Sequence, residues 1–299
     1  MEGVPRRTDA GRQVPAFAPV EESGMIAMSV RSWTTRHELG LFLFLAFLLS
    51  WALWPLVLLN ADSSPLVPFG PLGAALIVTA VSGGWRGVLA LVAQLGRWRV
   101  RPRWYVVALV GPFVLTALAG AVAVAAGAPS PGLGVYSDWS GVLASLVATA
   151  VIVGLFEEVG WRGFALPRMQ RDHAALSAAL ALGLVWALWH LPELVSDSSE
   201  REPAPYLLAV LAYSVLITWL YNRTRGSLPV VILFHAAINT AARFLMPEFP
   251  SRYDVTAWWC YAAVYVLAAV AVVAVAGASR PTTAEGPGVA GPTRRVSSG

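Results

Sequence analysis

Four side chains with the chemistry needed to hydrolyse an amide bond lie in three separate apolar stretches of the sequence. Glu157 occurs in GLFEEVGWRGF, His190 in LGLVWALWHLPEL, and His235 and Asn239 in LPVVILFHAAINT. A glutamate can take a proton from water, directly or on a metal ion, and neutral imidazoles can orient that water or bind the metal. An amide beside an imidazole can stabilise the oxyanion of an attacked carbonyl group. If the three stretches converge, they enclose a polar chamber suited to this reaction.

Glu158 and Arg162 lie close to Glu157 in the sequence, and the three charged side chains are expected to have different roles. Residues four apart on a helix meet on one face, so Glu158 and Arg162 are expected to form an ion pair. Glu157 is rotated by about 100° from Glu158 and points elsewhere, which leaves its carboxylate for chemistry. The alternative is a charge cluster that marks the cytoplasmic end of an apolar stretch.

The two histidines within apolar stretches also have two interpretations. A single histidine in a membrane helix often makes a hydrogen bond between helices and has no catalytic role. Two of them, together with the glutamate pair, favour a shared site. His235 and Asn239 are four residues apart, so the imidazole and the amide project from the same helix face. The other two histidines, His37 and His173, lie in the flanks of apolar stretches.

The composition is that of a membrane protein. Of 299 residues, 57% are hydrophobic and 13% are charged, and the mean hydropathy is +0.63, whereas soluble domains are about a quarter charged. A membrane-crossing helix needs about 20 mainly apolar residues. We therefore expect an all-α, polytopic, multi-pass bundle of about eight transmembrane helices in the cell membrane. The eight stretches are about 39–59, 66–83, 104–127, 141–165, 175–195, 204–221, 228–246 and 256–277.

The arginines indicate the orientation of the chain and its partners. All 21 basic residues are arginines, and 18 of them fall on one side of the eight-span arrangement. Short cytoplasmic loops carry an excess of positive charge, so both termini are expected in the cytoplasm. Because the arginines are spread between apolar stretches, they indicate no nucleic-acid partner. The expected partners are the lipid bilayer and a membrane-associated protein or peptide substrate.

Segments outside the spans complete the predicted organisation. Residues 1–35 and 279–299 are polar and interrupted by Pro and Gly, and both are expected to be disordered and cytoplasmic. The transmembrane bundle then occupies residues 36–278. Within it, GGWRGVLALVAQLGRWRVRPRW, between the second and third spans, is expected to form an amphipathic helix in the inner interface. Cys260 is the only cysteine, which excludes an internal disulfide and zinc sites built on paired cysteines.

Three short motifs resemble those of a known family. EEVGWR, WALWH and HAAIN are similar, in order and spacing, to the EExxxR, aromatic-xxx-His and HxxxN motifs of the CAAX protease and bacteriocin-processing (CPBP) intramembrane peptidases. The second motif often begins with Phe, where this chain has the aromatic Trp186. The resemblance covers about residues 100–245, the CAAX-protease-like core. It implies a general base at Glu157, the family's histidines at His190 and His235, its amide at Asn239, and structural and electrostatic support from Glu158 and Arg162.

The resemblance implies an intramembrane endopeptidase of bacterial type, commonly classed as a metalloprotease. Its cofactor would be a divalent metal such as zinc, held by Glu157, His190 and His235, or else water activated by the glutamate alone would suffice. CAAX-type proteolysis, processing of secreted peptides and a role in self-immunity are all implied substrate settings. The alternatives are a non-enzymatic transporter, scaffold or immunity protein that uses the same polar cluster, and a purely structural bundle.

A shared site requires Glu157 on the fourth helix and His190 on the fifth helix to lie at the same depth in the membrane. A fifth helix that began at Ala175 would lift His190 by about 22 Å, away from a glutamate near the cytoplasmic side. We therefore expect the fourth helix to be long with Glu157 near its middle, and the fifth to start effectively near Ala179 after an interfacial segment over 168–178. Gly154, Gly160 and Gly163 are expected to let neighbouring helices approach closely.

Overall fold

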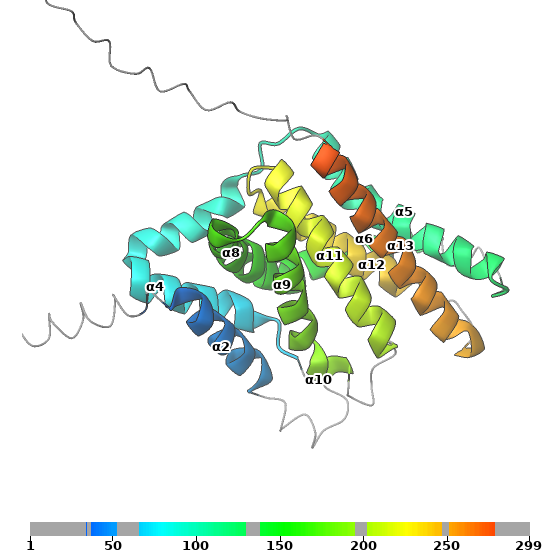
Figure 1. The fold of residues 1–299 in the computed structure, drawn as a ribbon, viewed down its shortest axis with the longest axis horizontal. Coiled ribbons are helices and arrows are strands. Elements are labelled where there is room, and N and C mark those ends of the chain that lie inside the picture. Colours follow the sequence, from blue (N-terminus) through cyan, green and yellow to red (C-terminus); the bar gives the residue numbers. More distant parts are fainter. Residues whose placement is uncertain are drawn as a thin grey trace, which may run out of the picture.

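The computed structural model describes residues 34, 37–52, 66–129, 138–194, 202–246 and 251–278, and this described part is helical without a strand. The N-terminal segment 1–35, apart from Thr34, and the tail 279–299 lie outside the described residues, so their predicted disorder stays a prediction. The helices, shown in Figure 1, are α2 (Glu38–Trp51), α4 (Phe69–Val92), η1 (Ala93–Gly96), α5 (Arg103–Ala125), α6 (Trp139–Thr149), η3 (Ala150–Gly154), α7 (Leu155–Glu158), η4 (Val159–Ala165), α8 (Leu166–Asp172), α9 (Ala175–Trp189), α10 (Leu191–Leu194), α11 (Pro203–Arg223), α12 (Leu228–Leu245) and α13 (Ser251–Ala278).

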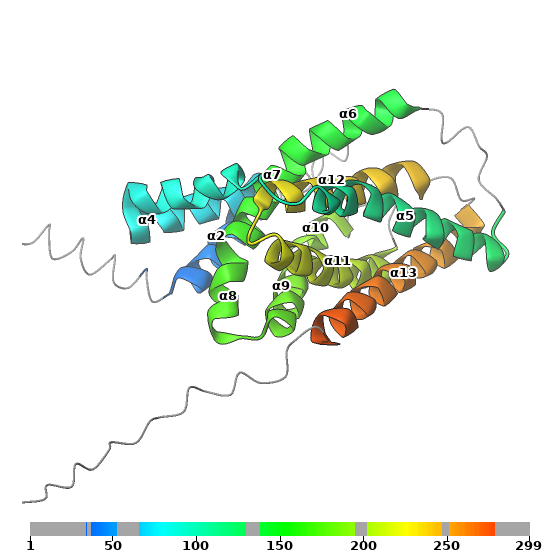
Figure 2. The same cartoon turned by 90° about the horizontal axis from the view of Figure 1, so that it is seen from above.

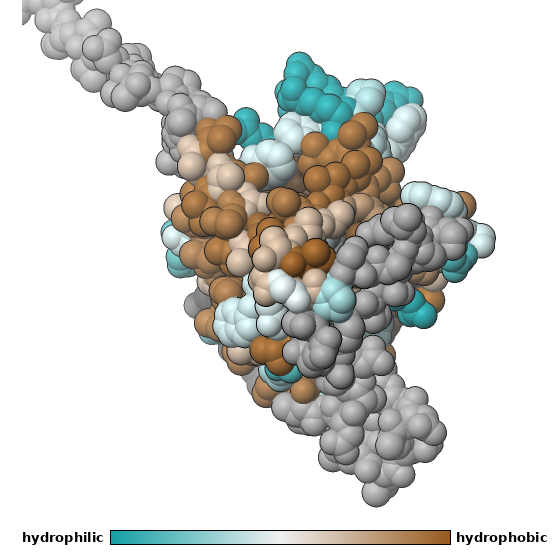
Figure 3. Space-filling view, turned by 90° about the vertical axis from the view of Figure 1, so that its right-hand side faces the viewer, coloured by the Kyte–Doolittle hydropathy of each residue, from teal (hydrophilic) through white to brown (hydrophobic). Residues whose placement is uncertain are grey.

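The helices confirm an all-α polytopic membrane bundle. Within the described residues, six helical segments are long and apolar enough to cross a membrane: Phe69–Gly96, Arg103–Ala125, Trp139–Asp172, Pro203–Arg223, Leu228–Leu245 and Val255–Val275. Two shorter apolar helices, α2 and α9, correspond to the first and fifth predicted stretches. Apolar side chains cover much of the surface that faces the viewer in Figure 3, as expected for a surface in contact with lipid. The cytoplasmic location of the termini stays a prediction.

Helix α4 bends sharply at Gly84, which separates a membrane-crossing part from a second helical part (Figure 1). Gly84 has φ 62° and ψ −163°, a conformation that glycine adopts because it has no side chain. The segment beyond the bend continues into η1 and carries the exposed Trp85, Leu89 and Val92. A separate helix therefore exists where the sequence predicted one, and its location in the membrane interface stays a prediction.

The fourth membrane helix is continuous from Trp139 to Asp172, with Glu157 near its middle. It begins at Asp138, whose carboxylate accepts hydrogen bonds from the N–H of Gly141 and the hydroxyl of Ser140, and these contacts lower the pKa of that carboxyl from its ordinary value. Two π-helical stretches, η3 and η4, flank α7. Such stretches are rare and occur often at functional sites.

The fifth helix begins at Ala175, so the prediction of a start near Ala179 is wrong. Residues 168–178 mostly complete α8 and open α9, and their predicted location along the membrane interface, or steep entry into it, stays a prediction. Glu157 and His190 nevertheless lie at similar heights along their helices, because the fourth helix extends to Asp172 and does not stop near residue 165. Glu157 and His190 are therefore both about 22 Å along their helices from the α8–α9 turn, at the usual helical rise.

Close helix packing around the fourth helix occurs at the predicted glycines. A side chain at Gly160 would put its Cβ 2.5 Å from both Cβ and the backbone oxygen of Pro71 on α4. A Cβ at Gly154 would lie 3.1 Å from the backbone oxygen of Ile232 on α12. Helices α4 and α12 therefore pack closely against the central part of the fourth helix, on either side of α7 (Figure 2).

Candidate active site

Glu157 is buried in the bundle and is held by Trp186 of α9. Its side chain is 2% exposed, and its Oε2 accepts a hydrogen bond of 2.7 Å from the indole Nε1 of Trp186. Within the described part of the chain, no hydrogen bond reaches the other carboxylate oxygen, Oε1. One oxygen of Glu157 is thus fixed in position, and the other is available to act on a substrate or water.

Glu158 forms a buried charged cluster with Arg162 and His235. Its Oε1 accepts hydrogen bonds from Arg162 at 2.9 Å and from His235 Nδ1 at 2.8 Å. Both Glu158 and Arg162 are fully buried, and His235 is 3% exposed. The guanidinium of Arg162 also lies 4.4 Å from the centre of the Trp186 ring, a favourable cation–π arrangement. The predicted Glu158–Arg162 pair is therefore present. Because Arg162 is buried, it should not be counted among the 18 arginines that were assigned to one side of the membrane.

His190 lies at the C-terminal end of α9, and its own helix fixes the orientation of its ring. Its Nδ1 is 2.8 Å from the backbone oxygen of Trp186. A carbonyl oxygen can only accept, so Nδ1 must carry the hydrogen, and in the neutral ring Nε2 keeps its lone pair. The rings of both Trp186 and Trp189 pack against the imidazole, at 5.6 Å and 4.9 Å between centroids.

Asn239 lies one helical turn beyond His235 on α12 and is half-buried. No hydrogen bond to its amide occurs within the described residues, so its donors remain available for a ligand. The structure thus brings Glu157, Glu158, Arg162, His190 and His235 together around Trp186, and it places Asn239 on the same helix as His235.

Trp186 is the residue whose role the sequence did not reveal. Its indole donates to Glu157, stacks with Arg162, and lies 5.2 Å from His235 and 5.6 Å from His190 between ring centroids. Its place four residues before His190 was the available signal, because residues at this spacing share a helix face. The motif pattern alone indicated only that an aromatic ring was needed there.

Gln94 of η1 connects the segment beyond the α4 bend to the fourth helix. Its Nε2 donates to the backbone oxygen of Gly163 in η4 at 3.1 Å, and its Oε1 accepts from the Tyr221 hydroxyl of α11 at 3.1 Å. Ser227, which precedes α12, donates to the backbone oxygen of Arg97 at 2.6 Å. These contacts tie the connecting segment to the helices that carry Arg162 and His235.

The predicted metal ligands do not form a preformed set in this arrangement. Among the described residues, no group of three His, Cys, Asp or Glu side chains is placed to hold a metal ion. Glu157 is engaged with Trp186, and Glu158 with Arg162 and His235. A divalent metal on Glu157, His190 and His235 stays a prediction.

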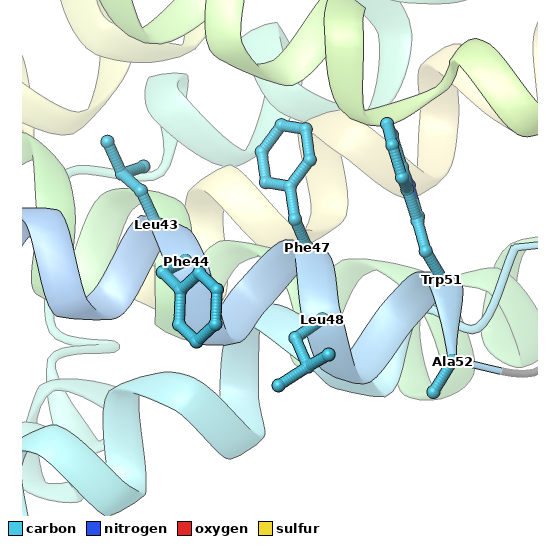
Figure 4. Close-up of a pocket in the computed structure, with 6 residues that line it drawn as sticks. All are labelled: Leu43, Phe44, Phe47, Leu48, Trp51 and Ala52. Carbon is cyan, nitrogen blue, oxygen red and sulfur yellow. The ribbon is translucent and has the colours of Figure 1, made fainter.

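An apolar pocket of about 430 Å³ lies along α2 (Figure 4). Phe47 and Trp51 project to one side of the helix and Phe44 and Leu48 to the other. The indole Nε1 of Trp51 donates to the backbone oxygen of Trp189 at 3.1 Å, one residue before His190. The pocket is therefore connected directly to the end of α9.

Comparison with known proteins identifies the same region of the chain. Residues 139–241 match the family described as type II CAAX prenyl endopeptidase, Rce1-like. A curated protein of Methanococcus maripaludis, CAAX prenyl protease 2, is 32% identical over 119 residues, which cover 37% of this chain and 42% of that relative. The chain thus aligns with less than half of the relative's length. The matched region contains Glu157, Glu158, Arg162, His190, His235 and Asn239.

Proposed function

We propose that this chain, whose residues 139–241 match the Rce1-like CAAX prenyl endopeptidase family, is an intramembrane endopeptidase that hydrolyses a peptide bond in a membrane-associated protein or peptide. The main support is the buried cluster in which Glu157 and two imidazoles, from three membrane helices, gather around Trp186. Such ionisable groups are costly to hold in a membrane and are rarely kept without a function.

Glu157 is the proposed general base. With Oε2 held by Trp186, its Oε1 takes a proton from water as the water oxygen attacks the carbonyl carbon of the peptide bond. The protonated carboxyl then gives this proton to the leaving amine when the carbon–nitrogen bond breaks. Glu157 returns to its ionised form, so each cycle consumes one water and one peptide bond.

His190, His235 and Asn239 have the proposed role of positioning water and stabilising the oxyanion. The ring of His190, which is oriented by the contact of its Nδ1 with the Trp186 carbonyl oxygen, has the proposed role of orienting the attacking water. The Asn239 amide donates to the oxygen that becomes negative during attack. Glu158 accepts from His235 Nδ1 and so fixes the ring, whose Nε2 faces away from that carboxylate. If His235 is protonated, this Nε2 is a second donor to the oxyanion.

The proposed substrate contains an apolar segment within the membrane. The curated relative is named CAAX prenyl protease 2, and a prenyl group would be one such apolar part of a substrate. The α2 pocket with Phe44, Phe47 and Trp51 offers an apolar surface one hydrogen bond away from the residue before His190. The apolar part of the proposed substrate, a lipid group or a membrane-embedded peptide segment, would lie against this surface.

The test is cleavage by the full chain in detergent or proteoliposomes. A fluorogenic peptide with a farnesylated CAAX end serves as the first probe, and its unprenylated form as the comparison. Glu157→Gln and His235→Ala should each lower turnover below detection. Glu157→Gln should keep membrane abundance and melting temperature near those of the original chain, whereas His235→Ala should also lower the melting temperature, because it removes a buried hydrogen-bond partner of Glu158. His173→Ala, at an exposed position in the α8–α9 turn, is the matched control and should cleave normally. Normal turnover by Glu157→Gln would refute the proposal.

The metal question has a separate test. Elemental analysis of the purified protein, with and without His190→Ala, measures whether one metal ion per chain depends on that histidine. A stoichiometric metal lost with His190 supports the predicted ligand set. A metal-free sample that keeps full turnover supports water activated by Glu157 alone.

A further inference from the structure

A second cavity, of about 310 Å³, lies between α9, α11 and α13 and includes none of the proposed catalytic residues. It is bounded by the first turn of α9, the C-terminal end of α11 and the later part of α13. Its volume is at the lower end of the about 300–1,000 Å³ that is typical of ligand sites. The cavity is therefore large enough for part of an amphiphilic ligand.

One end of the cavity is suited to an anion. Ala174 and Ala175, at the start of the 15-residue helix α9, line it, and no side chain caps this helix. The first N–H groups of a helix lack partners within the helix and carry a partial positive charge. Arg223 at the end of α11 lines the same end and is exposed. An uncapped helix N-terminus beside a guanidinium favours a phosphate group.

A buried hydroxyl in the lining of the cavity is a second and independent indication of a ligand. Thr218 lines the cavity, is 2% exposed, and its Oγ1 has no hydrogen-bond partner among the described residues. A buried polar group without a partner is costly, so such a group commonly serves a ligand or water. Thr218 is five residues before Arg223 on α11, which places it about 7 Å further along the helix at the usual rise.

The remaining lining is apolar. Val215 of α11 and Val272 and Val273 of α13 provide aliphatic surface, and both helices contain candidate membrane spans. The order along α11 is thus guanidinium, hydroxyl, then aliphatic side chains. A phospholipid has the same order, with phosphate, ester group and acyl chain.

We propose that this cavity binds one anionic phospholipid. Its phosphate lies between the N-terminus of α9 and Arg223, an ester oxygen accepts from the Thr218 hydroxyl, and an acyl chain runs along Val215, Val272 and Val273. Inorganic phosphate shares the headgroup charge but cannot fill the apolar part, so the lipid is the expected occupant. The inference concerns a site apart from the peptidase chemistry and does not depend on it.

The experiment uses the full chain, delipidated in a neutral detergent. Dioleoyl phosphatidylglycerol, dioleoyl phosphatidylcholine or inorganic phosphate is added, and native mass spectrometry measures retained lipid while thermal unfolding measures stabilisation. We expect one phosphatidylglycerol per chain to resist removal and to raise the melting temperature. Phosphatidylcholine should be retained less well, and inorganic phosphate at matched concentration should not displace the lipid.

Three variants assign the binding to this cavity. Arg223→Gln should weaken phosphatidylglycerol binding by about tenfold or more, as expected for a lost charge-assisted hydrogen bond. Thr218→Val should weaken it less and should leave the lipid-free protein at least as stable, because it removes an unpartnered hydroxyl. Arg225→Gln, in the turn after α11 and outside the cavity lining, is the control and should bind like the original chain.

Three results would overturn the proposal. The first is equal retention of phosphatidylglycerol and phosphatidylcholine, which would show that the cavity does not select an anionic headgroup. The second is full displacement of the lipid by inorganic phosphate, which would leave a free-anion site only. The third is unchanged binding by Arg223→Gln, which would place the bound lipid elsewhere on the chain.

Discussion

The indole Nε1 of Trp186 donates a 2.7 Å hydrogen bond to Oε2 of Glu157, across the interface between the fourth and fifth membrane helices. This contact holds one oxygen of the proposed base while the ring of the same tryptophan packs against both histidines. A single side chain therefore sets the relative positions of groups from three helices.

Trp186→Phe should keep the fold and lower turnover. The substitution keeps an aromatic ring but removes the donor, and a hydrogen bond to a charged group contributes about 1.5–3 kcal/mol. We expect the turnover number to fall by about ten- to a hundredfold, measured with the fluorogenic peptide. Trp161→Phe is the control, because the buried Nε1 of Trp161 has no partner among the described residues. Equal activity of the two variants would show that the donor has no role.

The Glu158–Arg162 pair should matter for stability as well as for activity. Glu158→Gln leaves the buried guanidinium without its counter-charge, and breaking a buried pair in this way costs about 3–5 kcal/mol. The melting temperature in detergent should therefore fall markedly. The double variant Glu158→Gln with Arg162→Met should recover most of the stability but none of the turnover, because His235 still lacks its carboxylate acceptor. A single variant that melts like the original chain would contradict this assignment.

The helices were predictable because lipid imposes a strong pattern on the sequence. A segment that crosses a membrane must satisfy its own backbone hydrogen bonds, so length and apolar composition alone located the stretches that became α4, α5, α11, α12 and α13. The end of the fourth helix was not predictable in this way. The apolar stretch ends near residue 165, yet the helix continues to Asp172. Arg168 is accommodated there by a 2.7 Å ion pair with Glu38 of α2.

Part of the site was predictable from spacing within one helix. The four-residue separation of Glu158 and Arg162 correctly indicated their ion pair. The bond between His235 and Glu158 joins residues of different helices and depends on how these helices pack. The same holds for Trp186 and Glu157. The spacing of residues within one helix contains no information on how two helices pack. These partners could therefore be identified only in the structure.

Gln94→Leu should disturb the site from a distance. The change removes the donor to Gly163 and the acceptor for Tyr221, and it leaves both groups buried without that partner, at a cost of about 1–3 kcal/mol each. We expect lower thermal stability and a lower turnover number. Tyr221→Phe removes only the second contact and should have a smaller effect on both measurements. The opposite order would mean that Gly163 does not depend on Gln94.

Gly160→Ala should separate the fourth helix from α4. The new Cβ would lie 2.5 Å from the backbone oxygen of Pro71, and backbone atoms cannot rotate away as a flexible side chain does. Overpacking of this kind typically costs about 1–3 kcal/mol, and because Gly160 lies two residues from both Glu158 and Arg162, turnover should fall along with the melting temperature. Gly40→Ala on α2 is the matched control, since no atom lies within 4 Å of its added Cβ. In a helix that control should be neutral or stabilising, by up to about 1 kcal/mol. If Gly160→Ala and Gly40→Ala have the same melting temperature, α4 does not need this close approach. Packing at Gly160 then has no part in holding the charged cluster.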